Sequence, residues 1–321
     1  MNSRWRRWVM IGGAAAVAVG LTRMLARFPW ADARDATLEA NAALLTAALA
    51  VNLVSLITKG WAWQLLLRPV KRVGWLAAQQ ATLAGSAVSD LATSVVGEAA
   101  RIQVLVRKSG IGWHHALASV VYLRAVEGVG LAVFLLAAPI LVPLPPELRL
   151  AQAVAFAVLV VGLMVVVLRP RTRLVSWLPG PLQRAAAALG DLASARALPA
   201  PLALALVNWA AQWATYGLVL RAIGVHAALA ASFVALVAAN LATLVPVSPG
   251  NVGVFQAAIV LGLLPLGVDA DRAVLAGIAL QVIQIPPVLG LAAMVFGVNG
   301  LKQLRSQPQE PALAMERPRS G

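Results

Sequence analysis

Long apolar blocks, instead of a regular alternation of apolar and polar positions, dominate this chain of 321 residues. An apolar run of about 18 or more residues is the pattern of a helix that crosses a membrane. Short polar or basic stretches separate the blocks, so the pattern predicts an all-α, polytopic transmembrane helical bundle of about eight spans. The predicted spans are residues 8–24, 41–67, 116–142, 150–168, 202–220, 227–245, 254–266 and 273–298.

Two polar interruptions fall inside apolar surroundings. Residues 75–106 are only weakly apolar, and both of their flanks are basic, which predicts a re-entrant hairpin with both ends in the cytoplasm. Residues 246–253 contain two prolines and two glycines, so a continuous helix is not expected there. At membrane depth, non-helical backbone is tolerated only where protein or a water-filled cavity covers it. The second interruption therefore predicts a lined site.

The two interruptions also share a short sequence. Asp90-Leu91-Ala92-Thr93 is echoed by Asn240-Leu241-Ala242-Thr243. Such an echo is typical of an internal inverted repeat, in which paired broken helices meet near the bilayer midplane; the Ala, Leu and Val bias of the chain would also produce it, so both explanations stay open. On the repeat interpretation, a membrane domain (residues 1–301) has halves at 1–170 and 200–301, joined by an interfacial connector at 171–199. Residues 302–321 are expected to form a disordered cytoplasmic tail.

Composition and charge agree with a membrane protein. The chain is 60% hydrophobic and 12% charged, and its mean hydropathy is +0.82, whereas a soluble domain is about 25% charged. A net charge of +14 would indicate nucleic acid as the partner of a soluble protein. Here, with both termini placed in the cytoplasm, the cytoplasmic segments hold the whole surplus, as the positive-inside rule requires. We therefore expect no nucleic-acid partner.

Two acid–base pairs stand three residues apart on predicted helices, so the members of each pair share a helical face. Arg124 and Glu127 lie at membrane depth, where each charge costs at least ~2.5–3.5 kcal/mol. They form either a buried ion pair that holds helices in register or part of a polar path. Glu98 and Arg101 follow Gly97 and form either a solvated turn or a hairpin tip whose guanidinium faces a lipid phosphate.

The remaining polar positions can also be interpreted in two ways, one structural and one functional. Asp90 is expected to cap the second half of the hairpin, in preference to carrying protons. The segment Ser248-Pro249-Gly250-Asn251 is either a tight turn or the opening of a helix whose free N–H groups favour an anion. The chain has no cysteine and no clustered His and carboxylate pattern, so neither a metal site nor a cofactor is expected.

Three motifs along the chain carry a family resemblance. They are Gly97-Glu98-x-x-Arg101, Arg124-x-x-Glu127 and Pro246-x-Ser248-Pro249-Gly250-x-x-Gly253-x-x-Gln256. In this order they resemble the transmembrane, flippase-like region of lysylphosphatidylglycerol synthases and their stand-alone relatives, over about residues 8–300. The resemblance implies a multi-pass protein of the bacterial or archaeal inner membrane with a lipid-translocating role. In bifunctional relatives a separate soluble domain makes an aminoacylated phospholipid; we expect no such domain here.

The chain departs from the family pattern at three positions. Relatives usually have Asp where Glu127 stands, tend to have Glu where Gln256 stands, and have Arg near the position of Gln281. If the charged residues at positions 256 and 281 normally pair in relatives, their joint absence from this chain is expected, because a single buried charge without a partner is less stable than two neutral residues. At positions 256 and 281 this chain therefore offers no charge to a mechanism that would need one.

These observations predict a flippase- or scramblase-like protein, not an enzyme, that gives a phospholipid or lipid-linked headgroup a polar route across the membrane. Glu98, Arg101, Arg124 and Glu127 would line one wall, and Ser248 to Gln256 the opposing wall. Two alternatives stay open: a membrane-embedded transferase that uses a lipid carrier, and a non-transporting membrane subunit that docks a soluble partner. Expected partners are the lipid, a further copy of the chain or a separate synthase protein.

Overall fold

The computed structural model describes residues 40–141, 198–225, 228–243 and 251–306, together with single positions between 150 and 192. All regular structure in these residues is helical, which confirms the predicted all-α bundle. The predicted span 8–24, most of the span 150–168 and of the connector, and the end of the tail lie outside the described residues. The helices are α3 (Ala42–Leu67), α4 (Trp75–Leu91), α5 (Ser94–Ser109), α6 (Trp113–Leu141), α9 (Pro199–Ala222), α10 (Ala228–Ala242), α11 (Val254–Leu263), the 3₁₀ helix η5 (Leu264–Leu266) and α12 (Ala270–Ser306).

Three of the described helices are long and apolar enough to cross a membrane. These segments are Ala42–Leu67 in α3, Trp113–Leu136 in α6 and Ala270–Gly297 in α12. Helix α9 has 24 residues, which is about 36 Å and long enough to cross, but it carries buried polar side chains such as Asn208 and Thr215. Asn208 and Thr215 are buried in the bundle, where α9 packs against α3, α6, α10 and α12.

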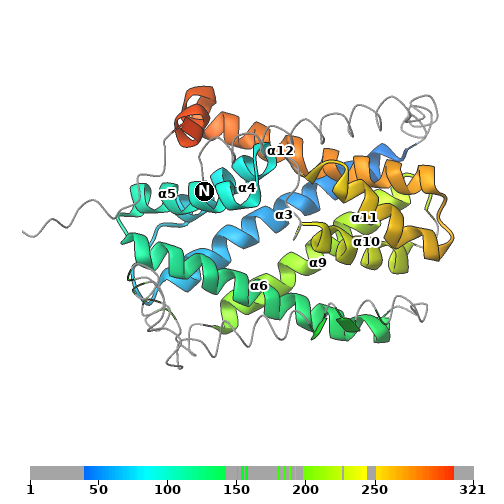
Figure 1. Cartoon of the computed structure of the whole chain (residues 1–321), viewed down its shortest axis with the longest axis horizontal. Coiled ribbons are helices and arrows are strands. Elements are labelled where there is room, and N and C mark those ends of the chain that lie inside the picture. Colours follow the sequence, from blue (N-terminus) through cyan, green and yellow to red (C-terminus); the bar gives the residue numbers. More distant parts are fainter. Residues whose placement is uncertain are drawn as a thin grey trace, which may run out of the picture.

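Helices α3 and α9 form the central pair of the bundle and run antiparallel (Figure 1). The backbone N–H of Asn41, at the start of α3, donates to the carbonyl of Ala222 at the end of α9 (3.0 Å). Near the middle of both helices, the buried Ser55 hydroxyl donates to Asn208 Oδ1 (2.6 Å). Corresponding helices of an inverted repeat run in opposite directions, so this pairing agrees with the repeat interpretation.

Each half of the bundle has its own apolar core. Around the second half of α3, the helices α4, α5 and α6 bury Trp63, Leu105 and Leu123. Around α9, the helices α10, α11 and α12 bury Leu236 and Ile259. In Figure 1, α4 and α5 lie at one end of the molecule, α10 and α11 lie toward the other, and α3 passes between them. Any contact between the two broken segments must therefore occur near the middle.

Within the predicted hairpin, residues 75–106, the chain forms two short antiparallel helices, α4 and α5, which reverse direction at Ala92–Thr93. The placement of both ends of the hairpin in the cytoplasm stays a prediction. With 17 and 16 residues, each is only about 25 Å long, shorter than the ~30 Å apolar thickness of a bilayer. Two glycines let the helices approach closely. A Cβ atom on Gly97 would lie 2.5 Å from the carbonyl oxygen of Gly85, and one on Gly85 would lie 2.8 Å from Arg101 Cβ.

Helix α12 contains the adjacent prolines Pro286 and Pro287. Pro287 has no N–H to donate to the carbonyl of Ile283, one turn earlier. The side-chain amide of Asn52 on α3 donates to that carbonyl instead (3.2 Å). The non-helical backbone within α12 lies at Gly297 (φ 65°, ψ 165°), so the break comes later than the prolines. The helix then continues to Ser306, into the stretch predicted as a tail.

Candidate functional site

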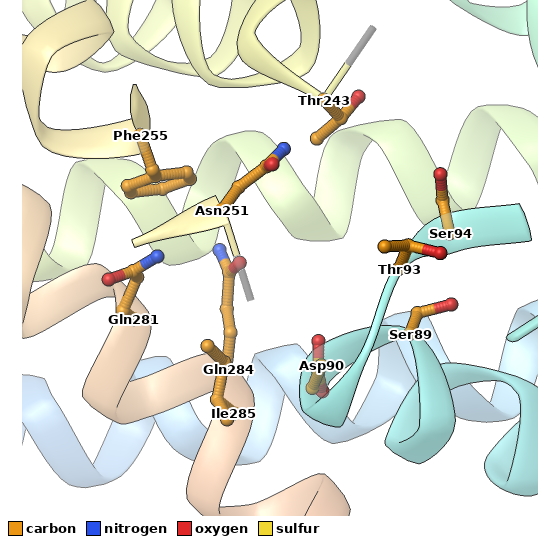
Figure 2. Close-up of a pocket in the computed structure, with 10 residues that line it drawn as sticks. All are labelled: Ser89, Asp90, Thr93, Ser94, Thr243, Asn251, Phe255, Gln281, Gln284 and Ile285. Atoms are coloured by element: carbon orange, nitrogen blue, oxygen red, sulfur yellow. The ribbon is translucent and has the colours of Figure 1, made fainter. Parts of the chain in front are cut away.

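The two broken segments meet at a cavity of about 170 Å³. The hairpin tip, the residues on either side of the second break, and the middle of α12 all contribute to it, as Figure 2 shows. Most of the lining side chains are polar and uncharged. The lining consists of Ser89, Asp90, Thr93, Ser94, Thr243, Asn251, Phe255, Gln281, Gln284 and Ile285.

The echoed sequences face the same cavity. Thr93 follows the end of α4 and Thr243 follows the end of α10, and both line the cavity from opposite halves of the bundle (Figure 2). They occupy matching positions in the echo of Asp90–Thr93 and Asn240–Thr243. A chance match in an Ala- and Leu-rich chain gives no reason for its two copies to converge, so the geometry favours an internal repeat.

The second break is held together by Asn251. Its backbone adopts a left-handed conformation (φ 53°), which Asn tolerates better than most residues, and its side-chain amide donates to the carbonyl of Ala242 at the end of α10 (3.2 Å). Gly253 follows with φ 90°, and α11 begins at Val254. The predicted residues Ser248, Pro249 and Gly250 lie outside the described residues. Asn251 thus links the two ends of the interruption.

Gln256 occupies the buried start of α11 and makes two hydrogen bonds. Its Oε1 accepts from the backbone N–H of Gly253 (2.7 Å), and its Nε2 donates to Oε1 of Gln281 on α12 (2.5 Å). The sequence analysis expected free backbone N–H groups near the start of this helix that could bind an anion. The N–H of Gly253 is instead hydrogen-bonded to the side chain of Gln256. The second bond places positions 256 and 281 opposite each other, which is the pairing inferred from their joint loss of charge.

An ion network joins α5 to α6. Arg124 Nη1 lies 2.8 Å from Glu127 Oε2, and Arg124 Nη2 pairs with Glu98 Oε1. The other oxygen of Glu98 lies 3.6 Å from Nε of Arg101. The main-chain carbonyl of Glu127 also accepts a hydrogen bond from the indole of Trp209 on α9 (2.8 Å). The four charged residues that the sequence singled out as two separate pairs therefore form one continuous network.

Arg101 and Arg124 differ in exposure, and this corrects the expected role of Arg101. From the sequence, Arg101 was expected either in a solvated turn or at a hairpin tip that faces a lipid phosphate. Instead it lies inside α5, is 5% exposed, and stacks its guanidinium 5.6 Å from the ring centre of Trp63. The side chain of Arg124 is 52% exposed. Arg124 is therefore the guanidinium of the network that an outside ligand reaches.

Asp90 is also placed differently from expectation. It lies in the last turn of α4, and the N-cap of α5 is Thr93, whose side chain makes no capping bond, so the predicted capping role of Asp90 is wrong. Its side chain lines the cavity. The reversal between α4 and α5 takes only Ala92 and Thr93, so Asp90 is still part of α4 and Thr93 occupies the N-cap position of α5.

The cavity and the network follow one face of α5. Ser94, Glu98 and Arg101 stand at positions i, i+4 and i+7 of this helix and so project from the same side. Ser94 lines the cavity, and Glu98 contacts Arg124. Four residues of helix rise by about 6 Å, so the network begins about one turn beyond the cavity rim. The two features form a single polar strip.

Comparison with known protein families identifies the family of this chain. A family model described as the lysylphosphatidylglycerol synthase TM region matches residues 9–292, most of the chain. The chain belongs to this family. No curated protein matches it. As a member of the lysylphosphatidylglycerol synthase transmembrane family, it is an integral membrane protein connected with lipid metabolism or transport.

Lys59 and Gln284 also belong to the site of this family member, although the sequence analysis did not identify them as site residues. Lys59, on α3, interacts electrostatically with Glu127, Arg124, Arg101 and Asp90, so it lies between the network and the cavity. The available signal was its position as the single charged residue of an apolar helix. Gln284 lines the cavity one turn after Gln281 and had no distinguishing signal.

The contact between Gln256 and Gln281 predicts strong coupling between these positions in the family fold. Gln256→Glu should lower the free energy of unfolding by about 2 kcal/mol, because it places a carboxylate in a buried site without a counter-charge. Adding Gln281→Arg should restore most of this loss, with a coupling energy of about 1–2 kcal/mol. Thermal unfolding of the two single variants and the double variant in detergent measures the coupling. Additive effects would contradict the pairing.

Proposed function

We propose that this protein lets phospholipid or lipid-linked headgroups cross the inner membrane of a bacterium or archaeon along the polar strip on α5. The observation that carries the proposal is the meeting of two interrupted segments at a cavity lined mostly by polar residues, about one helical turn from an ion network whose Arg124 is half exposed. Interrupted backbone within a membrane protein is tolerated only where it borders protein or water. A polar strip of this kind spares a headgroup the full cost of entering hydrocarbon.

Arg124 is the residue that would meet the lipid phosphate. A guanidinium offers paired N–H donors that match two phosphate oxygens, and Arg124 keeps half of its side chain accessible while Glu98 and Glu127 hold it in place. The carboxylates of Glu98 and Glu127 partly neutralise the charge of Arg124 and so weaken its attraction for a phosphate. A phosphate could therefore bind at Arg124 and then leave. A site on a transport route needs such moderate binding, because tight binding at one point would stop movement.

The placement of the carboxylates supports transport over group transfer. A membrane transferase needs a general base within reach of its substrate. Glu98 and Glu127 are both engaged by Arg124, and Glu127 is 8% exposed. We therefore propose a passive or ion-coupled, non-enzymatic route, with both termini in the cytoplasm. A separate synthase protein would supply the lipid, and a further copy of the chain is an additional candidate partner.

Replacing Arg124 tests this function. In liposomes that contain the purified protein and a fluorescent phospholipid, Arg124→Ala should slow transbilayer movement by about ten- to a hundredfold, the range expected from losing a charged hydrogen bond worth about 1.5–3 kcal/mol. Arg124→Lys should fall in between, because it keeps the charge but not the paired donors. The rate at which a membrane-impermeant quencher removes inner-leaflet fluorescence measures the movement.

Arg221→Ala is the matched control, because Arg221 is an exposed arginine in the last turn of α9, on another helix than the network. It should retain the wild-type rate. A thermal unfolding scan separates loss of function from loss of fold. Equal rates for wild type, Arg124→Ala and protein-free liposomes would refute the proposed function.

A further inference from the structure

The position of Asp90 carries a further inference about how lipid movement is driven, which rests on the proposed function. Among the described lining residues Asp90 alone is charged, and in Figure 2 its carboxyl group lies between Gln284 on α12 and Ser89 on α4. The residue is only partly buried. A cavity of about 170 Å³ has room for several water molecules at ~30 Å³ each, so a proton can reach this carboxylate through water.

Other polar groups of the lining are already engaged within the protein. The Asn251 amide donates to the carbonyl of Ala242 (3.2 Å), and the hydroxyl of Thr243 donates to a backbone carbonyl three residues earlier (2.6 Å). Gln284 is hydrogen-bonded to the buried Tyr216. Hydroxyl and amide groups do not titrate near neutral pH, so Asp90 is the described lining residue whose charge a proton can change.

The charged groups around Asp90 come from the helices that pack against α4. From α3, Lys59 interacts with Asp90 electrostatically. Helix α5 carries Glu98 and Arg101, which pair with each other (3.6 Å), and α12 faces the cavity with uncharged glutamines. Lys59 also interacts electrostatically with Arg124. Lys59 therefore links the charge of Asp90 to the guanidinium at which the lipid phosphate would bind.

Charge balance couples a proton at Asp90 to an anion at Arg124. Among the described residues, the cavity and the network together hold three cations and three carboxylates, which are Lys59, Arg101, Arg124, Asp90, Glu98 and Glu127. With all six charged the site is neutral, and a lipid phosphate adds one uncompensated negative charge. Such a charge is costly away from water. A proton on Asp90 removes the excess, so the proton and the phosphate each favour binding of the other.

We propose that Asp90 binds one proton when a lipid phosphate occupies Arg124, and that the proton and the lipid cross the membrane together. The proton comes from water on one side, is held on a carboxyl oxygen of Asp90, and leaves to water on the other side, where the carboxylate is restored. The substrate class is a phospholipid with one net negative charge. Because no net charge moves, a pH difference drives the lipid and a membrane potential does not.

Liposomes with the unaltered full-length chain and a trace of fluorescent phosphatidylglycerol test this coupling. This lipid is chosen because its phosphodiester carries one negative charge near neutral pH. With the interior one pH unit more alkaline and no membrane potential, the lipid should become about tenfold enriched in the inner leaflet, because the proton and the anion enter together. At equal pH, a potential of 100 mV, interior positive, should leave it evenly distributed. A membrane-impermeant quencher measures the distribution.

An anion that crosses alone gives the opposite pattern. It does not respond to the pH difference, and a potential of 100 mV enriches it about fiftyfold in the inner leaflet, because one elementary charge crosses the membrane. That pattern for the wild-type chain would overturn the proton coupling while the proposed function stands. Absence of movement beyond that in protein-free liposomes would overturn both.

Replacing Asp90 assigns the proton to its carboxyl group. Asp90→Asn keeps the shape but takes up no proton, so the lipid should lose its response to pH and gain a response to the potential. Asp90→Glu should behave like the wild-type chain. If Asp90→Asn moves no lipid, continued coupling in Asp90→Glu supports the assignment, and loss of movement in both variants overturns it. A pH-driven distribution in Asp90→Asn would place the proton on another group and overturn it as well.

Asp271→Asn is the matched control, because Asp271 is an exposed aspartate in the first turn of α12. This variant should keep the wild-type response to the pH difference and remain insensitive to the potential. Loss of the pH response in this variant would mean that the response is not specific to Asp90, and the assignment would be overturned.

Radiolabelled inorganic phosphate separates a lipid phosphate from a free one. Under the same pH difference, no uptake above that of protein-free liposomes is expected, because free phosphate lacks the acyl chains that hold a lipid beside the polar strip. Uptake driven by the pH difference would mean that the anion carried with the proton is soluble, and the assignment to a lipid would be overturned.

Discussion

Gly97→Ala should lower the free energy of unfolding by about 3 kcal/mol, because overpacking at a rigid contact is costly. The added Cβ would lie 2.5 Å from the carbonyl oxygen of Gly85 and would also collide with the side chain of Ser89. A backbone atom of a packed helix cannot rotate away, so α4 and α5 would have to separate. The measurement is thermal or denaturant-induced unfolding in detergent. Because Ser89 lines the cavity, lipid movement should fall as well.

Gly290→Ala is the matched control for this substitution. Gly290 lies inside α12, and nothing stands within 4 Å of the position that its Cβ would take. In a helix interior, Ala is favoured over Gly by about 0.5–1 kcal/mol, so this variant should keep or raise stability. If both variants unfold at the same temperature, close packing at Gly97 does not hold the hairpin together.

Glu98→Gln is expected to have the other large effect, a loss of about 3 kcal/mol in the free energy of unfolding. Glu98 bridges Arg101 and Arg124, and Arg101 is buried. Removing the carboxylate charge leaves a guanidinium in the interior without its nearest counter-ion, which is the costly way to break a buried pair. The shape of the side chain is kept, so packing is not the cause. The unfolding temperature in detergent measures the loss.

A double-variant cycle distinguishes the ion pair from a general effect of substitution at Glu98. In the background of Arg101→Met, which removes the buried charge and fills a similar volume, Glu98→Gln should cost much less than it does in the wild-type chain. An undiminished cost in that background would contradict the role of Glu98 as the counter-ion of Arg101. It would then act mainly through Arg124.

Several parts of the site could be predicted from sequence because they depend on local features. The two interruptions were recognised from proline, glycine and polar residues within apolar stretches, and the structure brings both to one cavity. The partnership of positions 256 and 281 followed from the joint loss of two charges, and the bond between Gln256 and Gln281 confirms it. The signal for the interruptions lay in the residue types themselves, and the signal for the pair lay in the family pattern that the chain resembles.

Other parts could not be predicted, because they depend on how helices turn toward one another. Arg101 and Arg124 were equivalent candidates from sequence, yet Arg101 is buried against Trp63 and Arg124 is half exposed. Asp90 was assigned to a cap because the length of the turn after α4 was unknown, and the observed turn brings Thr93 to that position. Lys59 stands out from sequence as the single charged residue of α3, but only the packing of α3 brings it next to Glu127 and Asp90.

By itself, the sequence determined that this protein is an all-helical membrane bundle with two broken segments, since hydropathy and backbone preference act over a few neighbouring residues. Only the tertiary structure decided that the breaks meet, that Glu98 joins two arginines on α5 and α6, and that one of these remains accessible. The physical reason is that such contacts link residues distant in sequence. Their formation depends on helix rotation and close packing at glycines such as Gly97, which local residue patterns do not specify.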